Sequence, residues 1–140
     1  MLHSRIHEVW ARALGTQLRE VESGFRYTSS STFETFSFPW APGHEPKDSL
    51  RVTAIAAAGR ELVEKRDGWL NPPDATEAEL KRRTLTNLYN ARPAWLAEAH
   101  RKLDETVLGA YAWPAALTDA EVVERLLQVN HERAPTTSSR

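Results

Sequence analysis

The spacing of histidines and carboxylates is the first feature of this sequence with chemical potential. His3 and His7 stand four residues apart, a spacing that places two zinc ligands on one face of a helix. No glutamate follows His3 in the pattern of zinc proteases and no third ligand is close, so the spacing favours two solvated histidines. His100 and Asp104 have the same spacing, which favours an orienting ion pair along a helix. A catalytic pair is the alternative, for which the sequence offers no nucleophile.

A dense run of cations is the second feature. Lys81, Arg82 and Arg83 are consecutive, and on a helix they point in different directions. The run is therefore typical of a solvated face balanced by acids such as Glu77 and Glu79, with phosphate contact as the alternative. In a DNA-binding protein, all three cations would be candidate DNA-contacting residues.

Hydroxyl and aromatic side chains gather in residues 25–40. The Ser/Thr-rich stretch over residues 28–32 offers hydroxyl groups that hydrogen-bond phosphates in nucleic-acid complexes. The aromatic side chains around it are more typical of a core than of base stacking. The candidate DNA-contacting residues in this stretch are Arg26, Tyr27, Thr28 and Thr32.

Composition limits the classes of protein that fit. The chain has 140 residues with 18 Lys and Arg against 19 Asp and Glu and 41% hydrophobic residues, which fits one globular domain rather than a disordered or fibrous chain. The formal charge of −1 lacks the basic signature of a free-standing nucleic-acid-binding protein. Without cysteine, disulfides, thiolate metal sites and a cysteine nucleophile are excluded. With no signal-peptide pattern and no run of ~20 apolar residues, the sequence predicts a cytoplasmic protein with no membrane partner.

The apolar spacing along most of the chain is helical, so we expect helices to position these residues. Apolar residues at spacings of three and four predict a first helix that ends at Gly15. Capping-box sequences over residues 76–79 and 118–121 predict two further helix starts, and Pro93 predicts another. Beyond residue 46 we therefore expect four helices, over residues of about 47–69, 76–88, 94–111 and 119–132.

Residues 25–40 are the least helical part of the chain. Aromatic and polar residues alternate at both ends of a Ser/Thr turn, which predicts a short β-hairpin-like element near residues 25–38. The predicted fold class is mainly α, a bundle of about four to five helices with this β element. The predicted units are residues 1–46, the first helix plus the β element; residues 47–132, a helical domain; and residues 133–140, a disordered tail.

Two strings of residues carry a resemblance to a known family. Residues 25–28, Phe-Arg-Tyr-Thr, lead to residues 32–40, Thr-Phe-Glu-Thr-Phe-Ser-Phe-Pro-Trp; the second string begins at residues 62–67, Leu-Val-Glu-Lys-Arg-Asp, and continues through residues 84–90 to the second capping box. The first resembles the segment that closes the target-recognition region of large class I SAM-dependent DNA methyltransferases, the MmeI-like type IIL restriction–modification enzymes and their methylase relatives. The second is similar to the C-terminal helical domain of the same enzymes, in the same order, and the resemblance spans residues of about 3–133.

Residues 71–74, Asn-Pro-Pro-Asp, are similar to the catalytic tetrapeptide of these methyltransferases, which is Asn-Pro-Pro followed by an aromatic residue. In that family the asparagine holds the target amine and the aromatic ring stacks on the flipped base. Asp74 cannot stack, no strand is predicted before Asn71, and the glycine-rich turn that would hold a methyl donor is missing. We therefore interpret the two prolines as the end of a helix.

The resemblance implies a non-catalytic C-terminal part of an adenine-N6 DNA methyltransferase of the restriction–modification or phage-defence type. In that family the methyl-donor pocket and the catalytic motif lie in an upstream domain. The resemblance implies that this chain contains no catalytic, cofactor-binding or metal-binding residue, whereas the full-length enzyme uses S-adenosylmethionine. Its implied partners are the catalytic methyltransferase domain or subunit and duplex DNA, which it would help to hold while the adenine is flipped.

A rival interpretation from another class is a helical protein-interaction or oligomerisation module without DNA contact. The chain has five Trp in 140 residues, more aromatic surface than a small core absorbs, and exposed apolar surface would favour a homodimer. A third interpretation is a small hydrolase that uses His100 and Asp104. Sharply salt-dependent binding to duplex DNA separates the first interpretation from the second.

Overall fold

The computed structural model describes residues 1–15 and 27–134, which form a helical protein. Within these ranges six α-helices and one short π-helical segment account for the regular structure, and no strand is present. The elements are α1 (Arg5–Leu14), η1 (Ser29–Phe33), α2 (Leu50–Leu70), α3 (Glu77–Arg82), α4 (Leu85–Ala91), α5 (Ala94–Ala110) and α6 (Asp119–Arg133). The predicted helical class is confirmed.

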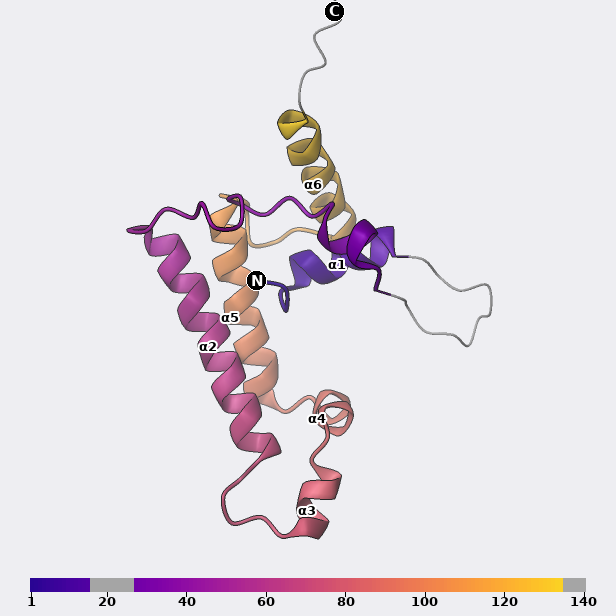
Figure 1. Ribbon diagram of the computed structural model, residues 1–140, viewed down its shortest axis with the longest axis vertical. Coiled ribbons are helices and arrows are strands. Elements are labelled where there is room, and N and C mark those ends of the chain that lie inside the picture. Colours follow the sequence, from indigo (N-terminus) through magenta and orange to yellow (C-terminus); the bar gives the residue numbers. More distant parts are fainter. Residues whose placement is uncertain (16–26, 135–140) are drawn as a thin grey trace, which may run out of the picture.

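The antiparallel pair formed by α2 and α5 is the largest helix–helix contact (Figure 1). On α5 the buried residues recur at spacings of three and four, which places one apolar stripe against α2. The corresponding buried residues of α2 are Ala58 and Leu62. The stripe of α5 comprises Leu96, Ala99, Leu103 and Val107.

The N-terminal segment belongs to the same hydrophobic core. Ile6 and Trp10 of α1 are each 1% exposed and belong to one cluster with the buried residues of α2 and α5. On the other side α1 packs against α6, whose Val122 and Leu126 are fully buried. The core is therefore continuous across residue 46, where the sequence divides the predicted units; that division stays a prediction.

The predicted β-hairpin near residues 25–38 is wrong in the described part of that stretch. The chain instead turns through η1, where the Thr32 hydroxyl donates to the Thr28 carbonyl at 2.6 Å and the Thr35 hydroxyl donates to the Ser31 carbonyl at 2.5 Å. Hydroxyl groups that bond carbonyls four residues earlier compete with the cross-strand pairing that a hairpin needs. Phe25 and Arg26 lie outside the described residues.

The helix predicted over residues 76–88 is divided in two, which raises the number of helices above the predicted bundle. The first capping box is present, with the Glu79 carboxylate accepting the Thr76 backbone N–H at 2.8 Å. At the break, the Thr84 hydroxyl accepts the Asn87 backbone N–H at 3.1 Å and starts α4. A threonine in the middle of an apolar pattern is thus a second N-cap, which the periodicity alone conceals.

The remaining helix ends follow local chemistry. Gly15 caps α1 and Asn71 caps α2, so the interpretation of residues 71–73 as a helix end is confirmed. The second capping box joins Thr118 and Glu121 at the start of α6, which extends to Arg133; residues 135–140 of the predicted tail lie outside the described ranges. None of the described helices has the length and apolarity needed to cross a bilayer.

Candidate functional site

The three consecutive cations of the predicted DNA-contacting set separate in space. Lys81 and Arg82 are exposed on α3, and Lys81 pairs with Glu77 at 2.8 Å in the exposed geometry that the sequence predicts. The Arg83 guanidinium instead donates to the Trp69 carbonyl at 2.7 Å and lies over the Trp69 ring, 5.1 Å from its centroid. Arg83 therefore links the α3–α4 connection to the end of α2, and its guanidinium is engaged by a backbone carbonyl of the protein.

The predicted residues near η1 also have different surroundings. Thr32 is fully buried, with its hydroxyl satisfied by the Thr28 carbonyl, so it has no access to a phosphate. Thr28 is half-buried and its carbonyl also accepts the Ser31 backbone N–H. Tyr27 is 48% exposed, and its hydroxyl lies 3.0 Å from His7 Nε2. Arg26 lies outside the described residues.

Tyr27 lies at the edge of a cleft formed by α1, the end of α2, α4 and the start of α5. An open part of about 450 Å³ and a more enclosed part of about 260 Å³ share one wall, which consists of His3, Glu8, Tyr89 and His100. We call this the histidine cleft. Its open part is also lined by Tyr27, His7, Arg66 and Leu85, and its enclosed part by Arg5, Arg92, Leu96 and Asp104.

Two tyrosine–histidine pairs line the open part of this cleft. Tyr27 contacts His7, and the Tyr89 hydroxyl lies 3.0 Å from His100 Nε2. His7 is 4% exposed, which corrects the prediction that it is solvated, and burial lowers its pKa. Desolvation also lowers the pKa of His3, and the neighbouring Arg66 charge lowers it further. Both histidines therefore favour the neutral form in the folded protein.

The carboxylates of the cleft already have partners. Glu8 pairs with Arg12 at 2.7 Å along α1. Asp104 Oδ1 accepts the Arg5 backbone N–H at 2.7 Å, so a carboxylate from α5 binds the N-terminus of α1. Burial raises the pKa of Asp104. The predicted ion pair between His100 and Asp104 is absent from the described contacts, because His100 bonds Tyr89 and Asp104 bonds α1.

Two arginines of the cleft have no carboxylate partner among the described residues. Arg66 is half-buried on α2 and Arg92 is exposed at the end of α4. Arg92 has a left-handed backbone, with φ of 40°, and Pro93 follows it. A non-glycine residue in this conformation is held there by its surroundings, and such residues concentrate at binding sites. The sequence did not predict Arg66, Tyr89 or Arg92 as site residues, because Arg66 lies on α2, Tyr89 and Arg92 lie on α4 and at its end, and no local pattern joins the two helices.

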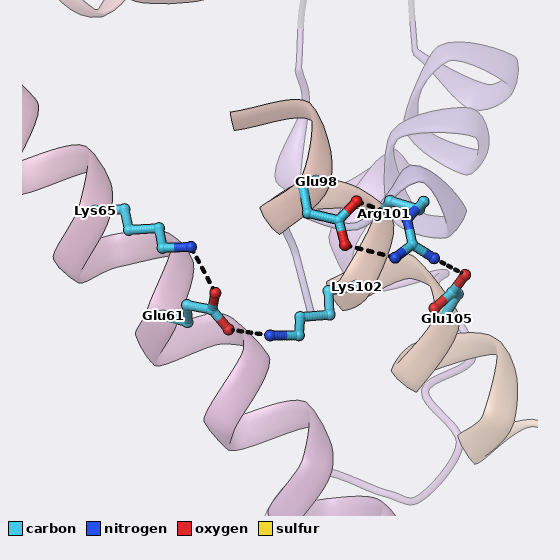
Figure 2. A network of polar contacts seen from close by, with 6 residues as sticks. All are labelled: Glu61, Lys65, Glu98, Arg101, Lys102 and Glu105. Atoms are coloured by element: carbon cyan, nitrogen blue, oxygen red, sulfur yellow. Dashed lines mark hydrogen bonds and ion pairs between the residues drawn. The ribbon is translucent and has the colours of Figure 1, made fainter. Parts of the chain in front are cut away.

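Other cations of the region are held in a network on the outer faces of α2 and α5 (Figure 2). Glu61 accepts from Lys65 and Lys102, each at 2.7 Å, while Arg101 bridges Glu98 and Glu105. Hydrogen bonds from Lys102 and Lys65 lower the pKa of Glu61 to about 2. These cations are therefore neutralised within the protein, unlike Arg66 and Arg92.

No group of three or more potential metal-ligating His, Asp or Glu residues occurs in the described ranges. The described residues thus define a helical module with a basic cleft. A family model described as "MmeI, C-terminal domain" matches residues 47–138. The match covers more than half of the chain, so the chain belongs to this family. This confirms the resemblance to the C-terminal region of MmeI-like enzymes and makes the chain a module of the restriction–modification type. Searches of curated proteins and of solved structures each return no match.

The residues that line the histidine cleft lie partly inside and partly outside the family match. It begins before α2 and includes Arg66, Tyr89, Arg92 and His100. His3 and α1 lie outside it. The cleft therefore forms where the matched helical region meets the N-terminal segment.

Proposed function

We propose that this chain is the non-catalytic C-terminal module of an adenine-N6 DNA methyltransferase of the restriction–modification type. In this role it packs against the methyltransferase domain and helps to hold duplex DNA while the target base is flipped. The family match over residues 47–138 is the observation that carries this proposal. The methyl donor, S-adenosylmethionine, then belongs to the full-length enzyme.

The DNA-holding part of the proposal is supported by the exposed cations of α3 and by a cleft that begins at the start of α4 and includes a tyrosine. Lys81 and Arg82 project from α3, and Leu85, which follows closely on α4, lines the same cleft as Tyr27. Lysine, arginine and tyrosine side chains of this kind contact DNA phosphates without reading sequence. The expected contribution is therefore affinity and orientation on the duplex.

The packing part of the proposal is supported by an apolar groove on another side of the molecule. It has a volume of about 470 Å³ and contains Phe33, which is 41% exposed. Apolar surface that is exposed in this way is typical of a contact with a partner. The apolar residues that line it are Met1, Leu2, Phe33, Phe38, Pro39, Trp40, Pro42, Val52, Ile55 and Ala56.

Duplex-DNA binding measured by fluorescence anisotropy tests the proposed DNA contact. Affinity should fall steeply from about 50 mM to about 200 mM salt, because bound phosphates release counterions. The variant Lys81→Gln/Arg82→Gln should reduce the slope of log affinity against log salt by about 2. The matched control Lys47→Gln/Arg51→Gln removes two exposed cations near the other end of α2 and should retain the wild-type slope. Salt-independent binding, or equal slopes for all three proteins, would exclude this DNA contact.

Calorimetry tests the non-catalytic part of the proposal. We expect no heat of binding when S-adenosylmethionine is added to the isolated chain, because the sequence has no glycine-rich turn for this donor. Saturable binding at micromolar concentration would contradict the assignment.

The apolar groove also favours a second candidate function, a protein-interaction module that forms a homodimer without DNA contact. Light scattering over a range of protein concentrations distinguishes the two. A dimer that Phe33→Ser dissociates, in a protein that shows no affinity for DNA, would support the second candidate. A strict monomer at high concentration would contradict it.

A further inference from the structure

The histidine cleft contains cations and hydrogen-bond donors that the rest of the protein leaves without an anion. We propose that this cleft binds a phosphate group between Arg66 and Arg92, against the wall formed by His3, Tyr89 and His100. This goes beyond the predicted contacts at Lys81 and Arg82. It rests on the proposed function only for the source of the phosphate, which we take to be the DNA backbone.

The cleft has the size and shape for this ligand. The wall of His3, Tyr89 and His100 is common to its open part, which contains Arg66, and to its enclosed part of about 260 Å³, which contains Arg92. Arg66 borders the open part and Arg92 the enclosed part, so both parts that meet at this wall contain an arginine. Donors that approach from four separate segments suit the several acceptor oxygens of a tetrahedral phosphate better than a planar carboxylate.

The charge distribution favours an anion over a cation. Glu8 is paired with Arg12, and Asp104 accepts the Arg5 backbone N–H, so both carboxylates of the cleft are already engaged. Arg66 and His100 lie close enough to His3 to lower its pKa by repulsion, after the larger effect of desolvation. A bound phosphate would relieve this repulsion.

The left-handed backbone at Arg92 supports a binding role. This conformation ends α4 and directs the chain into Pro93 and α5, so Arg92 lies where the two helices meet at the enclosed part of the cleft. The Arg92 backbone N–H donates to the Leu88 carbonyl at 2.9 Å and caps α4, while its guanidinium makes no ion pair with a described residue. Non-glycine residues with a left-handed backbone concentrate at binding sites, and here the guanidinium is left for a ligand.

Histidine-ring NMR resonances of the full 140-residue chain test the proposal directly. Inorganic phosphate and a short DNA duplex are titrated separately, with chloride at equal ionic strength as the control. The ring signals of His3 and His100 should shift and saturate, while those of His44 and His131, which do not line the cleft, should not follow them. The variant Arg66→Gln/Arg92→Gln should weaken this binding roughly tenfold or more, because each arginine contributes charge-assisted hydrogen bonds.

Arg51→Gln/Arg60→Gln is the matched control, since it removes two exposed arginines of α2 outside the cleft. Saturable shifts with both probes, lost in the cleft variant and kept in the control, support a phosphate site that DNA occupies. Shifts with inorganic phosphate alone support the site with a free phosphate as its source, and count against DNA contact here. A third outcome is duplex binding that depends on Lys81 and Arg82 without any shift of the His3 and His100 resonances. This outcome overturns the proposed phosphate site in the cleft and leaves the proposed function standing. Unmoved resonances with both probes overturn the cleft as well.

Discussion

The α2–α5 pair and the N-terminal segment, residues 1–49, are held together by different kinds of contact. The pair is formed by two long helices with a periodic apolar stripe and exposed ion pairs at their surface. In the described part of the N-terminal segment the regular elements are the short α1 and η1. Besides the core contacts of Ile6 and Trp10, single long-range hydrogen bonds attach this segment to α6 and to the residue that caps α5. Among these, the Tyr111 hydroxyl donates to the Ser37 carbonyl at 2.5 Å and the Asn130 amide donates to the Thr35 carbonyl at 3.0 Å.

This difference indicates how each region responds to substitution. In the α2–α5 pair many similar contacts contribute to stability, and any one exposed contact adds little to the free energy of unfolding. In the N-terminal segment a single polar group often has no substitute nearby. Asp104 is the clearest case, because it satisfies an N-terminal N–H of α1 whose N-cap residue, Ser4, makes no side-chain cap bond.

The largest expected effect tests whether both regions share one core. Trp10→Ala in α1 and Leu62→Ala in α2 each truncate a side chain that is 1% exposed, and each should cost about 3–5 kcal/mol of unfolding free energy. Urea unfolding followed by circular dichroism should show one transition in both variants, at lower midpoint. The control Leu50→Ala removes a side chain that is 85% exposed and should stay within about 0.5 kcal/mol of wild type. If Trp10→Ala leaves the main transition unchanged, the N-terminal segment unfolds independently.

The second prediction concerns the contact that joins the two regions at Asp104. Asp104→Ala removes the acceptor for the Arg5 N–H and should cost roughly 1.5–3 kcal/mol, in the range of hydrogen bonds to charged groups. Asp104→Asn keeps a carbonyl oxygen in place, and burial already disfavours the charged carboxylate, so this variant should cost less than the alanine. Urea unfolding of the two variants checks the order. Equal losses would mean that the carboxylate charge, rather than the acceptor oxygen, stabilises α1.

The same comparison explains what the sequence predicts and what it does not. Helices α2, α5 and α6 carry local signals, namely apolar periodicity, capping boxes and prolines, and they form close to their predicted positions. The hairpin prediction failed because Thr32 and Thr35 bond nearby carbonyls, an outcome that strand propensity does not include. The histidine cleft was not predicted, since Arg66 and Arg92 are brought together only by the packing of separate helices.

The third prediction uses the buried histidine of the N-terminal segment. Because burial lowers the pKa of His7, the unfolded chain binds a proton more readily than the folded protein as pH falls below the ordinary histidine pKa, ~6.5. Stability is therefore complete above that pH and decreases toward pH 5. His7→Gln should flatten this decrease, whereas the surface variant His44→Gln should follow the wild type. Thermal unfolding midpoints measured across this interval check the sign; a wild-type protein that gains stability on acidification would contradict it.

The smallest expected effect belongs to the exposed network of the α2–α5 pair. Arg101→Gln removes both of its ion pairs with Glu98 and Glu105, yet all three side chains are about half exposed, so solvent and salt screen their attraction. The unfolding midpoint should fall less than in Trp10→Ala, Leu62→Ala or Asp104→Ala, and the difference from wild type should vanish as salt is raised. The loss in Asp104→Ala should persist at high salt, because that hydrogen bond is half-buried. A large, salt-resistant loss in Arg101→Gln would mean that the network holds the helix pair as specifically as Asp104 holds α1, and the contrast between the two regions would fail.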